Sequence, residues 1–240
     1  MTGFLQIEAA SKQFGGLKAV DDVTLAISAG ELVSIIGPNG AGKTTLFNLL
    51  TGQLAPTSGK VVFEGRNISH LAPHKRARLG FGRTFQISQT LTSMSVLENA
   101  MVGAFLHHRS LAAAAAEATR ALDMVGLSSR ASDRAASLTL GERRRLELAR
   151  ALAMQPRLVL LDEVMAGLNQ SEVQEIIALV QRLNAGGLTF LVIEHNLKVV
   201  RAFSRRVIVL NRGAVLAQGS ADAVLGNPAV IEAYVGKRRA

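Results

Sequence analysis

The chain has 240 residues, 48% of them apolar, which is enough to bury the core of one large domain or of a domain with a subdomain. It contains no cysteine, which excludes disulfides, thiol nucleophiles and zinc sites with cysteine ligands. No run of about 18 apolar residues is present, and the first residues do not resemble a secretory signal. We therefore expect a soluble intracellular protein without a membrane span.

The formal net charge of +9 at pH 7 includes three basic runs, at residues 74–78, 143–145 and 237–239. Such runs can bind nucleic acid, lie beside anionic lipid headgroups or form a solvated face. No helix-turn-helix, zinc-finger or aromatic RNA-binding motif accompanies them, and aromatic residues make up 4% of the chain. A solvated face is the favoured interpretation, proximity to lipid stays open, and no nucleic-acid partner is expected.

The first third of the chain is rich in short apolar runs of β type. Strands are predicted at residues 4–8, 23–27, 32–36 and 60–64, and turn-forming glycines stand between them.

A phosphate-binding pattern, G-x-x-x-x-G-K-[ST], occupies residues 37–44 between a predicted strand and a predicted helix. The backbone N–H groups of such a loop turn inward around a triphosphate, and the positive end of the following helix points at the same anion. Lys43 would add a charge toward the β- and γ-phosphates, and Thr44 would offer a hydroxyl to Mg²⁺. The residues predicted to bind the triphosphate of a nucleotide here are Gly37, Pro38, Asn39, Gly40, Ala41, Gly42, Lys43, Thr44 and Thr45.

The middle of the chain changes from strand to helix. Residues 96–127 read as helical, with Gly126 as a terminator, and helices are also predicted at 142–154 and 171–184.

Apolar runs at residues 158–161 and 190–193 each follow a predicted helix, and short strands at 206–210 and 214–218 precede a helical tail. Alternating helices and continuous apolar strands predict an α/β fold with a parallel sheet covered on both faces. We expect one domain, in which residues 1–87 and 156–240 form a nucleotide-binding core and residues 88–155 an inserted helical subdomain.

Two carboxylates, Asp162 and Glu163, follow the apolar run at residues 158–161. The last residues of a buried parallel strand lie at the sheet edge where ligands bind in open α/β folds. Asp162 is suited to hold Mg²⁺ through water, and Glu163 to polarise a water that attacks the γ-phosphate. The alternative is an acidic turn without a function, which the presence of a phosphate-binding loop in the same chain disfavours.

Five ordered motifs resemble the ATP-binding subunits of ABC transporters, over essentially the whole chain. They are the phosphate-binding loop, Gln86 in the sequence Arg83-Thr84-Phe85-Gln86, residues 138–142 (Leu-Thr-Leu-Gly-Glu), the strand ending in Asp162-Glu163, and His195. Residues 14–16, 166–169 and 193–196 and the tail at 227–236 resemble the branched-chain amino acid importer group in particular.

The resemblance assigns roles to single residues. Phe14 would stack on adenine, and His195 would contact the γ-phosphate. Gln86 would sense Mg²⁺ and the attacking water, so that the catalytic set is Lys43, Gln86, Glu163 and His195, and the metal set Thr44, Gln86 and Asp162.

Four residues, Thr139, Leu140, Gly141 and Glu142, would reach the ATP of a second subunit. Leu140 and Glu142 differ from the family's usual Leu-Ser-Gly-Gly-Gln. Glu142 is expected to open a helix there, and its charge would repel a nearby phosphate.

The resemblance also implies a P-loop NTPase core of the ABC ATPase type, with an N-terminal antiparallel β subdomain. The protein would dimerise around ATP and Mg²⁺ and drive transmembrane permease subunits from the cytoplasmic face of the inner membrane. The second ATPase subunit would be identical or related, and a periplasmic solute-binding protein would complete the importer.

Two other functions stay open. An export ATPase of the lipopolysaccharide transport type shares the Gly-Glu-Arg-Arg-Arg sequence found at residues 141–145, although the tail and residues 166–169 favour the importer. An ABC ATPase acting on DNA or ribosomes, or a binding module without turnover, is disfavoured because the chain has no second cassette and retains Glu163 and His195.

Overall fold

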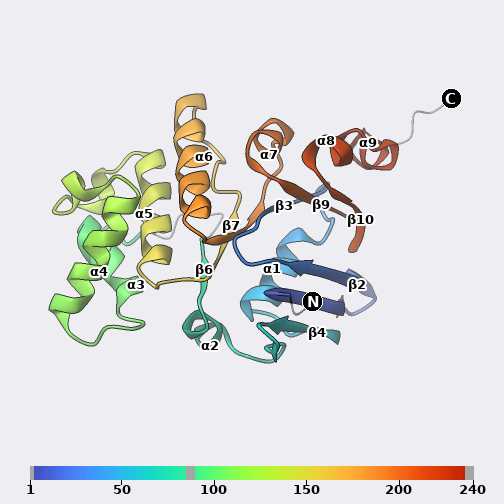
Figure 1. Cartoon of the computed structure of the whole chain (residues 1–240), viewed down its shortest axis with the longest axis horizontal. Helices are drawn as coiled ribbons and strands as arrows, with labels where there is room; N and C mark the ends of the chain where they lie inside the picture. Colours follow the sequence, from blue (N-terminus) through green and yellow to red (C-terminus); the bar gives the residue numbers. More distant parts are fainter. Residues whose placement is uncertain (1–2, 85–89, 236–240) are drawn as a thin grey trace. The chain divides into compact units, whose positions relative to one another are not determined.

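The computed structural model describes residues 3–84 and 90–235, and the chain divides into two compact units. Residues 1–76 and 187–240 form the first unit, and residues 77–186 form the second. Figure 1 labels most of their elements, and each unit is described by itself.

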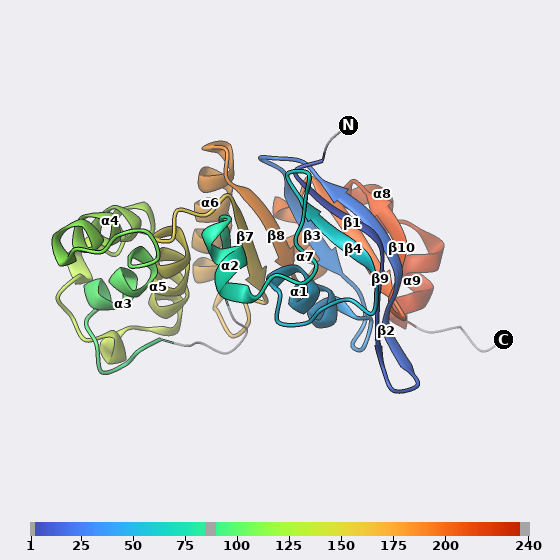
Figure 2. The same ribbon diagram turned by 90° about the horizontal axis from the view of Figure 1, so that it is seen from below.

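An antiparallel sheet in the order β2-β1-β4-β5 begins the first unit. Its strands are β1 (Leu5–Phe14), β2 (Leu17–Ile27), β4 (Ser58–Phe63) and β5 (Arg66–Asn67). Strands β1 and β2 form a hairpin in which Leu5 pairs with Ile27 and Phe14 with Leu17. Figure 2 shows β1, β2 and β4 running side by side. The expected antiparallel subdomain is confirmed, and its first two strands extend to the Gly15-Gly16 turn.

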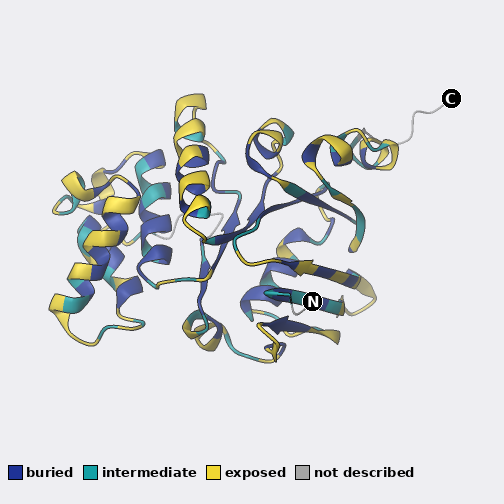
Figure 3. Ribbon diagram, in the orientation of Figure 1, coloured by how far each residue is buried: buried dark blue, intermediate teal, exposed yellow. Residues whose placement is uncertain are grey.

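A second sheet in this unit runs β10-β9-β3-β8. Its strands are β3 (Leu32–Ile36), β8 (Thr189–Ile193), β9 (Arg206–Asn211) and β10 (Ala214–Gly219). Strand β3 pairs in parallel with both β8 and β9, whereas β10 is antiparallel to β9. Every residue of β3 and β8 is buried (Figure 3), as expected of apolar strands covered on both faces.

The helices of the first unit are α1 (Lys43–Thr51), α7 (Leu197–Phe203), α8 (Ala221–Leu225) and α9 (Pro228–Val235), and α2 (Pro73–Arg78) contains the boundary between the two units. Helices α7, α8 and α9 pack against the strand that leads into the phosphate-binding pattern. One buried cluster joins β3, β9, α7, α8 and α9, and it consists of Ile36, Val200, Val207, Val209, Ala221, Val224 and Val230. Because Ile36 is the last residue of β3, this cluster fixes the start of the loop that follows.

The second unit contains a parallel strand pair and a group of helices. Strand β6 (Phe81–Arg83), which the sequence did not predict, pairs with β7 (Leu158–Asp162). The helices are α3 (Val96–Ala104), α4 (Leu111–Met124), α5 (Leu140–Leu152) and α6 (Gln170–Ala185), with short 3₁₀ turns at Ser128–Arg130 and Ala135–Ser137.

The helical stretch expected at residues 96–127 is in fact two helices. Ser110 caps the start of α4, where its hydroxyl accepts the backbone N–H of Ala113 at 3.2 Å. The break between the helices was missed because the Ala-rich sequence that follows Ser110 is typical of a continuous helix. Both α4 and α5 pack against α3. The subdomain boundaries at residues 88 and 155 remain predictions, and α3, α4 and α5 fall within the second unit.

The structure contains, among residues 3–84 and 90–235, no helix long and apolar enough to cross a membrane.

Candidate nucleotide site

The phosphate-binding pattern forms a loop between β3 and α1. Gly42 is the N-cap of α1, and the N–H of Leu46 closes the first helical turn on the carbonyl of Gly42 at 2.9 Å. Asn39, Gly40 and Thr44 are exposed, and Thr45 is half-buried. The loop therefore presents backbone and a hydroxyl to solvent at the positive end of a helix, which suits an anionic ligand.

Two of the loop glycines are required by the protein's own backbone. A β-carbon at Gly37 (φ 152°) would lie 2.2 Å from the carbonyl oxygen of Leu210, and one at Gly42 (φ 100°) would lie 2.3 Å from that of Ala19. Any side chain at either position would push the loop away from β9 or β2.

The side chain of Lys43 contacts the first two residues of this loop. Its side chain is buried, and its ammonium donates to the carbonyl oxygens of Gly37 at 2.7 Å and Pro38 at 3.2 Å. An ammonium is a compact donor that can exchange such carbonyls for phosphate oxygens, which bind it more strongly.

The far end of α1 is held by Arg76, which is fully buried. Its guanidinium donates to the carbonyl oxygens of Leu49 at 2.6 Å, Leu50 at 2.7 Å, Ser69 at 3.0 Å and Leu71 at 3.0 Å. Burial lowers the pKa of Arg76 to about 10, so the group stays charged at neutral pH. The interpretation of residues 74–78 as a solvated basic face is wrong for this residue.

Phe14 ends β1 beside the Gly15-Gly16 turn. Its side chain is 46% exposed, so it is no core aromatic, and the ammonium of Lys12 lies 5.3 Å from its ring centroid. His195 is exposed in the loop after β8, and the next residue, Asn196, caps α7 by accepting the N–H of Lys198 at 3.1 Å. Both residues remain predictions as nucleotide contacts.

In the second unit, β7 ends in Asp162, which is buried. Its Oδ2 lies 3.2 Å from the Nη2 of Arg83, and its backbone N–H donates to the hydroxyl of Thr84 at 3.4 Å. Arg83 is the last residue of β6 and Thr84 follows it, so the segment that leads to Gln86 also orients Asp162. Gln86 itself lies outside the described residues.

Glu163 has a left-handed backbone with φ of 48°. That conformation costs a residue other than glycine about 1–3 kcal/mol and is often found at functional sites. The buried residues Val164 and Met165 hold the chain beyond it, and the N–H of Ala166 donates to the carbonyl of Glu163 at 3.1 Å.

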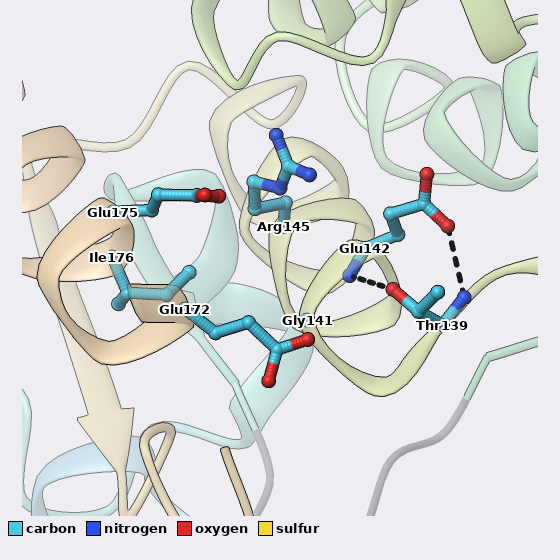
Figure 4. A pocket seen from close by; sticks show the side chains of 7 residues that line it. All are labelled: Thr139, Gly141, Glu142, Arg145, Glu172, Glu175 and Ile176. Atoms are coloured by element: carbon cyan, nitrogen blue, oxygen red, sulfur yellow. Dashed lines mark hydrogen bonds between the residues drawn. The ribbon is translucent and has the colours of Figure 1, made fainter. Parts of the chain in front are cut away.

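Residues 139–142 form the start of α5. Thr139 is the N-cap, its hydroxyl accepts the N–H of Glu142 at 3.2 Å, and the carboxylate of Glu142 accepts the N–H of Thr139 at 2.9 Å (Figure 4). Helix α5 begins at Leu140, two residues before the predicted start, and Glu142 lies in its first turn, where it closes a capping box.

The charge of Glu142 is balanced within the second unit. The Nη1 of Arg130 donates to the other carboxylate oxygen of Glu142 at 2.6 Å. The pKa of Arg130 is raised by its hydrogen bond to Asp133 and further by the charge of Glu142. Repulsion of a phosphate by Glu142 is thus weaker than the sequence alone suggests.

The same motif packs against α6 and the loop before it. A β-carbon at Gly141 would lie 2.7 Å from Oε1 of Glu172, and one at Gly167 would lie 3.1 Å from Cδ2 of Leu140. Figure 4 shows the Glu172 carboxylate directed at Gly141, beside a pocket of about 180 Å³. Sequence reasoning missed these contacts, as it missed Arg76, Arg83 and Arg130, because each depends on a partner from another element.

Comparison with protein families gives two matches. The ABC transporter family model matches residues 20–166, and a model described as branched-chain amino acid ATP-binding cassette transporter matches residues 214–240.

Individual relatives match over nearly their whole length. The high-affinity branched-chain amino acid transport ATP-binding proteins BraF of Pseudomonas aeruginosa and LivG of Escherichia coli are each 39% identical, covering 97% of this chain and 98% of theirs. The lipopolysaccharide export system ATP-binding protein LptB of Acidithiobacillus ferridurans is 35% identical, with 98% of both chains covered.

Solved structures give the same result. The ADP conformation of an ATP-binding cassette of an ABC transporter superposes with a TM-score of 0.90 at 33% identity, covering 99% of this chain and 100% of that one. A dimeric bacterial ABC transporter cassette gives a TM-score of 0.81 at 28% identity, covering 90% and 98%.

Proposed function

This chain belongs to the ABC transporter family, and we propose that it is the ATP-hydrolysing subunit of an importer for branched-chain amino acids or related solutes. One observation carries the importer assignment: the C-terminal segment, residues 214–240, matches the model of the branched-chain amino acid cassettes. Overall sequence identity separates import from export less clearly, because an importer subunit is 39% identical to the chain and an export subunit 35%.

The loop at residues 37–45 would wrap the triphosphate. Lys43 would exchange the carbonyls of Gly37 and Pro38 for β- and γ-phosphate oxygens, and the exposed face of Phe14 would stack on adenine. The ring lies exposed at the turn of the β1–β2 hairpin and is not part of the core, so a base can stack on it.

Thr44, Asp162 and Gln86 would hold Mg²⁺. Hydroxyl and carboxylate oxygens are the ligands that this cation prefers, and the described donors, an exposed Thr44 and a carboxylate ending β7, fit it. When bound, the ion neutralises charge that develops on the transferred phosphoryl group.

Glu163 would accept a proton from the attacking water, and His195 would contact the γ-phosphate. The left-handed backbone of Glu163 supports this role because it fixes the direction in which the carboxylate leaves the strand. His195 follows β8 at the carboxyl end of a parallel strand, where ligands of α/β folds bind.

The start of α5 would contact the ATP that is bound to a second ATPase subunit. Thr139 and Leu140 are exposed there, which makes the helix N-terminus accessible, while Gly141 and Glu142 are engaged within the chain. A related cassette forms dimers, which supports the same assembly here.

Permease subunits would supply the transport path from the membrane, and a periplasmic solute-binding protein would deliver the solute. Several apolar side chains on the helices of the second unit are exposed and could contact a protein partner, namely Val102, Phe105, Leu111 and Met124. The chain would then lie at the cytoplasmic face of the inner membrane as a peripheral subunit.

Lipopolysaccharide export is the second candidate. It is supported by the 35% identity to LptB and by the Gly-Glu-Arg-Arg-Arg sequence at residues 141–145.

Copurification and uptake test the two functions together. The tagged chain is isolated from membranes in mild detergent, its partners are identified, and the complex is reconstituted in vesicles containing ATP. We expect permease subunits of an amino-acid importer and ATP-dependent uptake of labelled leucine, isoleucine or valine when a solute-binding protein is supplied. Lys43→Ala should keep the partners and lose uptake, because it removes the charge that faces the phosphates. Copurification of a lipopolysaccharide export permease would overturn the importer assignment.

A further inference from the structure

Arg83 and Asp162 are brought together by the pairing of two short parallel strands in the second unit. Strands β6 and β7 lie side by side (Figure 1), and Arg83 is in register with Leu160. Because side chains alternate along a strand, Leu160 and Asp162 lie on the same face of β7. The long side chain of Arg83 therefore extends along β7 to the carboxylate that ends it.

The carboxylate of Asp162 is nearly enclosed, and Arg83 is its charge partner. The side chains of Asp162 and Arg83 are 6% and 12% exposed, and the Nη2 of Arg83 donates to Oδ2 of Asp162 at 3.2 Å. Burying a carboxylate is unfavourable unless the group is paired and hydrogen-bonded. The backbone is fixed as well, because the N–H of Asp162 donates to the hydroxyl of Thr84 at 3.4 Å, and the N–H of Thr84 donates to the carbonyl of Leu160 at 3.0 Å.

The ion pair restricts how Asp162 can bind a metal ion. A cation that contacts both carboxylate oxygens would compete with the guanidinium for Oδ2, and it would approach a like charge in a poorly solvated site. Binding through one oxygen, directly or through water, avoids both costs. Mg²⁺ requires nearly ideal octahedral coordination and keeps several waters, whereas the larger Ca²⁺ accepts bidentate carboxylates and irregular geometry.

We propose that Arg83 is a positioning residue that makes the proposed metal site selective for Mg²⁺ over Ca²⁺. Arg83 does so by engaging Oδ2 of Asp162, while Thr84 keeps the end of β7 in place for this contact. The inference rests on the proposed function, in which Asp162 holds Mg²⁺, and it adds a specificity-determining residue that acts through Asp162.

Binding of AMP-PNP, a nucleotide that resists hydrolysis, measures this selectivity without turnover. Isothermal titration calorimetry of the full chain in MgCl₂ and in CaCl₂ gives two Kd values, whose ratio, Ca²⁺ over Mg²⁺, reports the preference. We expect Arg83→Gln to lower this ratio about 10-fold, a usual effect of removing a group that holds a metal-binding carboxylate. Arg78→Gln, the same change at an exposed residue shortly before β6, should leave the ratio unchanged.

Two further variants separate selectivity from folding. Arg83→Lys keeps a positive charge beside Asp162 and so preserves the fold even where Arg83→Gln does not. It replaces the planar guanidinium by a compact ammonium, and the ratio should fall about 2- to 3-fold. In an Asp162→Asn background, Arg83→Gln should change the ratio by less than about twofold, because a side-chain amide offers a metal a single oxygen.

Three results would overturn the inference. One is an unaltered chain that binds AMP-PNP equally well with both ions, and another is an unchanged ratio in both Arg83→Gln and Arg83→Lys. The third is an equal weakening of binding in both salts together with a lower thermal midpoint, which would show that Arg83 serves folding alone. Failure of the proposed function would look different, since the unaltered chain would then bind AMP-PNP with neither ion.

Discussion

Arg76 holds the C-terminal end of α1, the helix that follows the phosphate-binding loop. A buried guanidinium that donates to carbonyls instead of pairing with a carboxylate is costly, yet this one satisfies four carbonyls around the C-terminal end of α1. That end of a helix carries a partial negative charge, so the cation and the helix dipole stabilise each other. The helix that begins at Lys43 is consequently anchored at both of its ends.

Replacing Arg76 should therefore destabilise the protein severely. Arg76→Ala leaves several buried carbonyls without a donor, each of which costs about 1–3 kcal/mol, so we expect a loss of at least about 3 kcal/mol in the free energy of unfolding. Arg78→Ala, on the same short helix but exposed, should cost less than about 0.5 kcal/mol. Urea denaturation of both variants measures the difference, and equal midpoints would contradict the role given to Arg76.

Helices α5 and α6 begin in the same way. Each starts with a capping box, formed by Thr139 and Glu142 in α5 and by Asn169 and Glu172 in α6. The second box pins one oxygen of Glu172 to the N–H of Asn169 at 3.0 Å and leaves the other against Gly141. Gly141 is therefore required by packing within the chain, whatever it contributes to a phosphate on a second subunit.

A double-mutant cycle at Gly141 and Glu172 tests this coupling. Gly141→Ala alone should gain no stability, because the added methyl group displaces Glu172 from its cap, which offsets the higher helix propensity of alanine. In a Glu172→Ala background the same change should stabilise the protein by about 0.5–1 kcal/mol. Chemical denaturation of the four proteins gives the coupling energy, expected near 1 kcal/mol, and strict additivity would rule out the contact.

The fold was largely predictable because its elements are encoded locally. Continuous apolar runs predicted β3, β7 and β8, which are buried along their full length, and the Gly15-Gly16 turn marked the first hairpin. Strand β6 was missed because three residues with a central glycine carry no periodicity. Helix α7 was missed because seven residues are too few to show a helical period, although Asn196 caps its start.

The sequence predicted the loop of the candidate site and missed the partners of its charged residues. The loop at residues 37–44 is a contiguous pattern whose spacing dictates its backbone, so the sequence reveals it. Arg83 pairs with Asp162, and Arg130 pairs with Glu142. Each pair joins residues from different elements, so no local sequence pattern predicts it. These two arginines hold carboxylates that remain predicted site residues.

The proposed ATPase cycle depends on one carboxylate, Glu163, and on ATP-dependent pairing of two subunits. Phosphate release and analytical sedimentation of Glu163→Gln, with and without ATP and Mg²⁺, measure both. We predict turnover slowed by about 10²–10⁴-fold, undiminished ATP binding and a dimer that appears only with ATP, since the amide cannot accept the proton of the attacking water. Lys43→Ala should bind ATP weakly and remain monomeric. Normal phosphate release by Glu163→Gln, or no ATP-dependent dimer, would contradict the mechanism.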